Sequence, residues 1–68
     1  MSVSDKIRTA RLAAGLTQQA AADATGVHVT QWCRWERGSS PRAEMLGRLA
    51  IALGVTLEAL VPMPREED

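Results

Sequence analysis

Residues 26–38, GVHVTQWCRWERG, interleave two tryptophans with polar side chains that form directional hydrogen bonds. Trp32 and Trp35 are three residues apart, so on a helix both indoles fall on one face. Thr30 and Arg34 are four residues apart and share another face. The guanidinium of Arg34 carries a rigid fork of donors, whereas the Thr30 hydroxyl can both donate and accept. The spacing therefore predicts a helix with one face for burial and one face for recognition.

These residues do not form a catalytic or metal-binding constellation. His28 and Cys33, the single histidine and the single cysteine, are five residues apart and point roughly 140° away from each other on a helix. They can therefore serve neither as a metal pair nor as a nucleophile and its base. The sequence also lacks a glycine-rich phosphate loop, so we expect no enzyme activity, no metal and no cofactor. Cys33 is expected to be a partly exposed packing residue rather than a redox sensor.

Length and composition predict one small helical domain. A domain of this length buries only about 60% of the surface that its unfolded chain exposes, so the core is small. Hydrophobic residues make up 46% of the 68, and the two tryptophans are the only aromatic ones, so alanine and leucine must supply most of the core. The sequence shows no signal-peptide pattern and no apolar run long enough to span a membrane. We therefore expect a cytoplasmic protein with no membrane partner.

The charges are unevenly distributed along the chain. The formal net charge is zero, which at first sight argues against a nucleic-acid partner because phosphate contacts require a positive field. Residues 1–48, however, carry seven Lys or Arg against four Asp or Glu, whereas residues 49–68 carry one against four. The basic part can face phosphate while the acidic end points away.

Caps, glycines and prolines divide the chain into five expected helices. The segments are residues 4–15, 18–25, 29–38, 42–53 and 56–60. The expected caps and stops are Ser4, Gly15, Thr17, Gly26, Gly38, Gly54 and Thr56. Pro62 and Pro64 forbid further helix, so we expect a domain over residues 1–62 and a disordered acidic tail over residues 63–68.

The second and third expected helices, joined by a tight turn, have the spacing of a helix-turn-helix, whose second helix can enter a DNA major groove. A wider set of residues resembles the phage repressor and Cro-type helix-turn-helix family, also called the XRE family. The set is Arg8-x-x-Arg11, Gly15-Leu16-Thr17-Gln18, Gly26-Val27, Trp35-Glu36-Arg37-Gly38, Pro41 and Leu53-Gly54-Val55. This resemblance, over residues 6–61, implies an all-α, compact five-helix domain like that of the lambda repressor.

The resemblance also implies roles for individual residues. In such proteins the glutamine after the second-helix cap, here Gln18, contacts a backbone phosphate. Bases are read from the early third helix, here Val29 and Thr30, and one turn later, here Arg34. The chemistry agrees, because Arg34 can donate to O6 and N7 of guanine, while the methyl groups of Val29 and Thr30 suit contact with a thymine methyl. Gln31 is a further candidate base reader.

A second set of residues is expected to bind backbone phosphates and to fix the register without reading sequence. The set is Thr17, Gln18, His28, Arg37 and Arg42. Arg37 is expected to act with the backbone amides at the starts of the second and fourth helices. His28 stands where a serine or threonine cap is usual, which weakens the expected start of the third helix because imidazole caps less well than a hydroxyl.

Two pairs of residues are expected to support the fold. The family often pairs an arginine of the first helix with the glutamate that closes the third, so we predict a partly buried ion pair between Arg11 and Glu36. Where the family usually has leucine in the second helix and isoleucine in the third, this chain has Ala21 and Trp32. The large residue is expected to fill the space left by the small one.

A surface for dimerisation is expected at the C-terminal end of the domain. Small DNA-binding domains gain affinity by dimerising on two half-sites about one helical turn apart. Ile51 lies off the buried stripe of the fourth helix and, with Val55, Leu57 and Met63, would form an apolar surface. The alternative is that Ile51 is a single exposed apolar residue without a partner.

Two functional hypotheses follow from the sequence. The first is a homodimeric, sequence-specific regulator of transcription, a repressor or controller protein, that binds double-stranded DNA at a palindromic operator and takes no small-molecule substrate. The second is a protein-interaction module, such as an antitoxin-type partner, with only secondary DNA binding. A large apolar patch around Ile51 and Met63, with Arg34 and Gln18 dispensable, favours the second.

Overall fold

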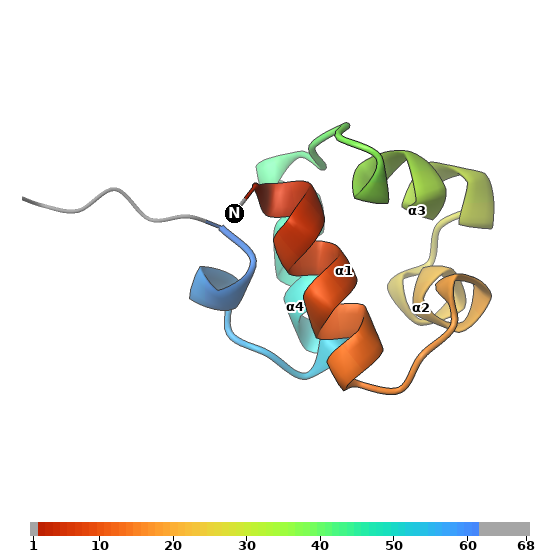
Figure 1. Ribbon diagram of the computed structural model, residues 1–68, viewed down its shortest axis with the longest axis horizontal. Coiled ribbons are helices and arrows are strands. Elements are labelled where there is room, and N and C mark those ends of the chain that lie inside the picture. The colour runs from red at the N-terminus through yellow and green to blue at the C-terminus, as the bar shows by residue number, and fades with distance from the viewer. Residues whose placement is uncertain (1, 62–68) are drawn as a thin grey trace, which may run out of the picture.

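Four α-helices make up most of the computed structural model, which describes residues 2–61. They are α1 (Val3–Ala13), α2 (Gln18–Thr25), α3 (Val29–Glu36) and α4 (Ala43–Leu53), and a 3-10 turn, η1 (Leu57–Ala59), follows α4. In Figure 1, α1 crosses in front of α4, while α2 and α3 lie to one side and η1 to the other. The part of the chain described here contains no strand, in agreement with the expected all-α class. The predicted tail, residues 63–68, lies outside the described residues.

Local signals set both ends of α2. Thr17 has extended backbone angles, and its Oγ1 accepts a hydrogen bond from the Ala20 amide at 3.0 Å. At the other end Gly26 adopts a left-handed conformation with φ of 85°, which glycine reaches without steric cost. The predicted bounds of this helix, residues 18–25, are confirmed.

The first helix begins earlier than predicted. Its N-cap is Ser2, whose Oγ accepts from the Asp5 amide at 3.2 Å, and Ser4 is a buried residue of the first turn. The prediction that Ser4 caps this helix is therefore wrong. The earlier start brings Val3 onto the helix, where it packs against the core, and this burial favours Ser2 over Ser4 as the cap.

The predicted fifth helix is replaced by the single turn η1. The Leu60 amide donates to the Leu57 carbonyl at 3.0 Å, which closes a 3-10 turn, and Thr56 makes no side-chain cap hydrogen bond. Only seven residues separate Gly54, where α4 ends, from Pro62, which leaves no room for several α-helical turns. Leu60 is fully buried, so packing rather than helix propensity holds this turn in place.

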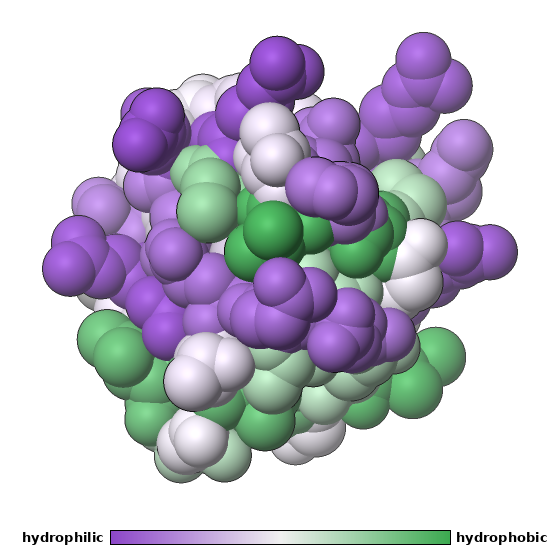
Figure 2. Space-filling model, turned by 90° about the vertical axis from the view of Figure 1, so that its right-hand side faces the viewer, coloured by the Kyte–Doolittle hydropathy of each residue, from purple (hydrophilic) through white to green (hydrophobic). Residues whose placement is uncertain are grey.

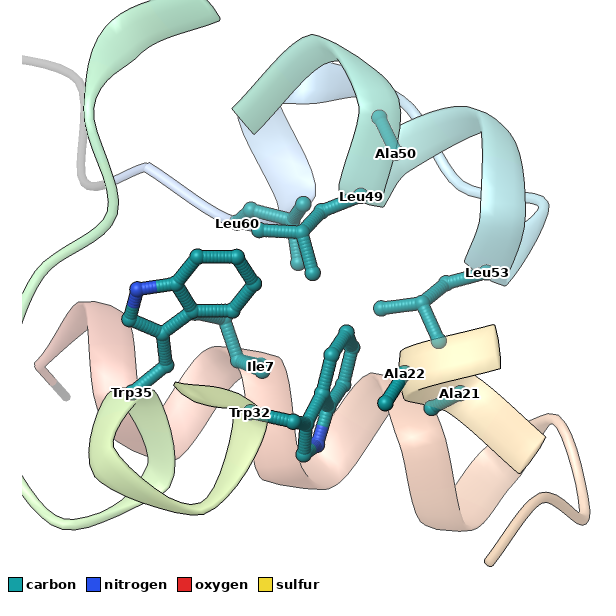
Figure 3. Close-up of a cluster of buried hydrophobic side chains, with 9 residues drawn as sticks. All are labelled: Ile7, Ala21, Ala22, Trp32, Trp35, Leu49, Ala50, Leu53 and Leu60. Carbon is teal, nitrogen blue, oxygen red and sulfur yellow. The ribbon is translucent and has the colours of Figure 1, made fainter. Parts of the chain in front are cut away.

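The core lies between the four helices and η1. Its buried hydrophobic members are Ile7, Ala21, Ala22, Trp32, Trp35, Leu49, Ala50, Leu53 and Leu60 (Figure 3). The two indoles point into this cluster with ring centroids 5.8 Å apart in an edge-to-face arrangement, which confirms both tryptophans as core residues. Trp32 and Ala21 are both fully buried on neighbouring helices, consistent with the predicted exchange of a large residue for a small one.

Candidate nucleic-acid interface

The start of α3 is fixed by a tight turn and a histidine cap. After Gly26, the Val27 amide donates to the Ala22 carbonyl at 3.0 Å, which ends α2 and redirects the chain. His28 is the N-cap of α3, and its Nδ1 accepts a hydrogen bond from the Thr30 amide at 3.1 Å. The imidazole thus supplies the cap that a serine or threonine hydroxyl would otherwise supply. Because Nδ1 is an acceptor, the neutral ring carries its hydrogen on Nε2.

One stripe of α3 is exposed while the opposite face is buried. Thr30 and Arg34 are exposed, as is Arg37 at the C-cap, whereas Trp32 and Trp35 are buried in the core. Val29 and Gln31, the other two predicted base readers, are half-buried. Their positions on the helix place them on opposite sides of the stripe. Thr30 and Arg34 therefore both face solvent, and one half-buried candidate base reader lies on each side of them.

Glu36, the last residue of α3, accepts four hydrogen bonds. Its Oε2 accepts from Arg11 Nε and from Trp32 Nε1, each at 2.6 Å. Its Oε1 accepts from Gln18 Nε2 at 3.1 Å and from Arg11 Nη2 at 3.2 Å. We call Arg11, Gln18, Trp32 and Glu36 the Glu36 network. Because its donors come from α1, α2 and α3, this network joins the end of α3 to both helices before it.

The ion pair in this network is largely shielded from solvent. The side chains of Arg11 and Glu36 are 11% and 6% exposed, and Arg11 Nη1 also donates to the Leu16 carbonyl at 2.9 Å. The structure thus brings together the two residues predicted to pair. Burial by itself raises the pKa of Glu36, but hydrogen bonds from Arg11, Trp32 and Gln18, and the charge of Arg11, outweigh it and hold that pKa below its ordinary value.

Both polar atoms of the Gln18 side-chain amide form hydrogen bonds that fix its orientation. Its nitrogen faces the Glu36 carboxylate, and its oxygen accepts a hydrogen bond from the Cys33 thiol at 3.4 Å. Exchanging the two amide atoms would place oxygen against a carboxylate, so Glu36 decides the orientation. One hydrogen of the amide nitrogen is left for another acceptor. Cys33 itself is half-buried, in agreement with the predicted partly exposed packing residue.

Two cavities flank the exposed stripe of α3. One, of about 350 Å³, is lined by Arg8, Arg11, Gln18, Cys33, Glu36 and Arg37. The other, of about 410 Å³, is lined in part by Val27, Gln31, Trp35, Pro41, Arg42 and Met45. Figure 2 shows the side of the molecule on which α2 and α3 lie, where hydrophilic side chains project along the upper part and enclose a small hydrophobic patch. Hydrogen-bonding groups and apolar surface are thus both available on this side.

A family model described as "Helix-turn-helix" matches residues 7–60, which include α2, the turn at Gly26 and α3. The chain belongs to the Cro/C1-type helix-turn-helix family. This family consists of DNA-binding regulators of transcription, so double-stranded DNA is the ligand of the domain. Neither a curated protein sequence nor a solved structure matches the chain significantly.

Within residues 2–61, no helix combines the length and the apolar character that crossing a membrane needs. The same residues contain no group of three or more His, Cys, Asp or Glu side chains placed to hold a metal ion.

Among the remaining predicted site residues that the structure describes, all but Val55 are exposed. Arg42 is the N-cap of α4 and makes no side-chain cap hydrogen bond. Thr17 and Arg37 are exposed. Ile51 is 84% exposed and Leu57 48%, whereas Val55 is half-buried. The predicted dimer residue Met63 lies outside the described residues.

Sequence reasoning missed three features of this helix-turn-helix domain. The hydrogen bond from Trp32 to Glu36 could have been suspected from their spacing of four residues on one helix. Arg8 was not assigned to a site, although it lies one helical turn before Arg11 and lines the same cavity. Leu12, 58% exposed, is a large apolar side chain at the surface of α1 for which the helical pattern gave no signal.

Proposed function

We propose that this helix-turn-helix protein is a sequence-specific regulator of transcription, a repressor or controller protein, that binds a palindromic operator as a homodimer. The observation that carries the proposal is the outward placement of Thr30 and Arg34 on α3 while both tryptophans anchor the opposite face. A helix held in this way can lie in the major groove with its exposed stripe against base edges.

Base reading is assigned to the exposed stripe and its two neighbours. Arg34 donates to O6 and N7 of a guanine, and Thr30 and Val29 contact thymine methyl groups. Gln31 reads a base from the opposite side of the stripe. The long side chain of Arg34 has no ion-pair partner among residues 2–61, which leaves its donors available for DNA.

Phosphate binding is assigned to residues that border the stripe. They are Thr17, Gln18, His28, Arg37 and Arg42. His28 has an Nε2 hydrogen to donate while Nδ1 caps the helix, and Gln18 keeps one amide hydrogen. Such contacts position the protein on the duplex without reading sequence.

The homodimer is assigned to the apolar surface around Ile51. At 84% exposed, Ile51 is the most exposed of the large hydrophobic residues in the described part of the chain, and Leu57 is also exposed. Burial of such side chains on association is favourable by roughly 25 cal/mol for each Å² of apolar surface. A two-fold dimer places two copies of α3 on half-sites about one helical turn apart.

A second candidate function rests on the same exposed isoleucine. An apolar side chain at 84% exposure also suits a different protein as partner, as in an antitoxin-type module with secondary DNA binding. In that case Arg34 would be dispensable for the main activity.

Selection of bound duplexes from a randomised DNA pool at near-physiological salt tests the proposal. Wild type, Arg34→Ala and the control Arg48→Ala are compared; Arg48 is an exposed arginine of α4 that lines neither cavity beside α3. We expect an enriched palindrome with half-sites about 10 base pairs apart, and loss of one base preference in Arg34→Ala only. Absence of enrichment above a salt-sensitive background contradicts sequence-specific binding and supports the interaction module.

A further inference from the structure

The cavity between α1, α2 and α3 contains Gln18 and Arg37, which are assigned to phosphate binding above, and Arg8, which has no assigned role. It has a volume of about 350 Å³ and is lined by Arg8, Arg11, Gln18, Cys33, Glu36 and Arg37. We infer that it binds a single phosphate of the DNA backbone, held jointly by Arg8 from α1 and Arg37 at the C-cap of α3. We call it the Arg8–Arg37 cavity. The inference rests on the proposed function and extends it, since it adds Arg8 and makes the two arginines share one phosphate.

The charges that line the Arg8–Arg37 cavity leave a positive excess. Its single carboxylate, Glu36, is paired with Arg11. Arg8 and Arg37 are both exposed, and neither forms an ion pair with any other residue in the range 2–61. Two unpaired guanidinium groups at one cavity favour an anion, and a guanidinium matches the geometry of phosphate oxygens.

The hydrogen-bonding groups of the Arg8–Arg37 cavity point to the same ligand. Both oxygens of Glu36 already accept hydrogen bonds, and the Gln18 oxygen accepts from the Cys33 thiol. What remains for a ligand is one amide hydrogen of Gln18 and the donors of the two unpaired arginines. A site that offers donors while its side-chain acceptors are engaged suits a ligand that only accepts, as a phosphodiester does.

The position of the Arg8–Arg37 cavity identifies the phosphate as part of a DNA backbone. Cys33 lies three residues after Thr30, and Arg37 three after Arg34, so the cavity runs along one side of the exposed stripe. A helix in the major groove, which is about 12 Å wide, has a sugar–phosphate backbone along each side. When Thr30 and Arg34 face base edges, the cavity therefore faces one of these backbones.

The volume allows a phosphate to enter with some of its hydration. A water molecule occupies about 30 Å³ in the liquid, so a cavity of about 350 Å³ holds a phosphate group and several bridging waters. The long side chains of Arg8 and Arg37 can then contact different oxygens of one phosphate, directly or through water.

The test compares Arg8→Gln, Arg37→Gln, the double variant and the matched control Arg48→Gln. The duplex is the one that wild type enriches from the randomised pool, and the dissociation constant is measured between about 50 and about 200 mM salt. Loss of one phosphate contact lowers the slope of log affinity against log salt by about 0.9 for each bound protomer. Because the remaining arginine still neutralises the shared phosphate, we expect each single variant to bind more weakly while keeping the slope of wild type, and only the double variant to lose slope.

Other results contradict either the shared site alone or the proposed function as well. If Arg8→Gln behaves like Arg48→Gln while wild type still selects its palindrome, the shared site is wrong and the proposed function stands. If each single variant loses about 0.9 of slope and the double variant loses twice as much, the arginines bind separate phosphates, and the shared site is again wrong. If wild type enriches no duplex, the proposed function fails and this inference fails with it. Melting temperatures equal to wild type are expected throughout, since both arginines are exposed.

A second measurement locates the phosphate independently of protein folding. The same duplex is prepared with a neutral methylphosphonate at one backbone position at a time. At one position in each half-site, the substitution should weaken wild type and leave the double variant unchanged. Equal weakening of both proteins at every position excludes a phosphate bound by these arginines.

Discussion

Trp32 Nε1 and Arg11 Nε donate to the same oxygen of Glu36, each at 2.6 Å. The indole of Trp32 is fully buried, so it fills the core and at the same time satisfies its own polar nitrogen. The hydrogen bonds to the Glu36 carboxylate in turn offset the free-energy cost of burying its charge. Trp32 thus connects the hydrophobic core to the polar contacts that orient α3.

Replacement of Glu36 by Gln should strongly destabilise the protein. The neutral amide leaves the Arg11 guanidinium, only 11% exposed, without a counter-charge, and loss of one partner of such a pair costs about 3–5 kcal/mol. Urea unfolding followed by tryptophan fluorescence measures the free energy of unfolding. The control is Glu44→Gln on α4, whose side chain is exposed and forms no ion pair with the described residues. Equal stability of Glu36→Gln and wild type would show that the ion pair is unimportant.

Replacement of Trp32 by Phe should cost more than replacement of Trp35 by Phe. Both substitutions remove similar volume from the core, but only Trp32 donates a hydrogen bond to Glu36. A hydrogen bond to a charged group contributes about 1.5–3 kcal/mol, so we expect a difference of that order between the two free energies of unfolding. Equal costs for the two variants would mean that Trp32 acts through packing alone.

Stability should decline in acid through Glu36. Its pKa is lowered in the folded protein from the ordinary value of 4.5, so between these two pKa values the unfolded state binds more protons. The contribution of Glu36 is therefore complete above pH 4.5 and is lost as the pH falls through the lowered pKa. Unfolding free energies measured over this range should fall more steeply for wild type than for Glu36→Gln. Parallel curves would contradict the lowered pKa.

Replacement of Ile51 by Glu should convert the proposed dimer to monomer. At 84% exposure the side chain contributes little to the fold, so the melting temperature of the monomer should change little. Sedimentation velocity across a concentration series measures the association. The matched control is Leu12→Glu, which places the same charge at another exposed apolar residue, on α1. Unchanged sedimentation of Ile51→Glu would exclude this surface as the dimer interface.

Features set by neighbouring residues could be predicted from the sequence, and features set by packing could not. Thr17 and Gly26 determine α2 locally, so both of its bounds were predicted. The choice between Ser2 and Ser4 as the cap of α1 depends on whether Val3 reaches the core, which a local pattern cannot show.

The candidate site likewise contains some contacts that could be predicted from the sequence and others that depend on packing. The family resemblance was enough to predict that Arg11 and Glu36 would be partners, and helical spacing to separate Thr30 and Arg34 from the tryptophans. Of the other donors to Glu36, Trp32 lies four residues away on the same helix, whereas the contact of Gln18 depends on the relative placement of α2 and α3, which local sequence patterns do not show. The position of Arg8 at a cavity shared with Arg37 required the placement of α1 as well.

Glu36 orients α3 from its C-terminal end, and none of the predicted base readers takes part in its network. Exchanging Thr30 or Arg34 for other residues would therefore leave the supporting contacts intact. The DNA sequence preference can then change by substitution at two or three exposed positions while the protein keeps its folded structure. The arrangement makes this domain a suitable starting point for selecting variants with new target sequences, in nature or in the laboratory.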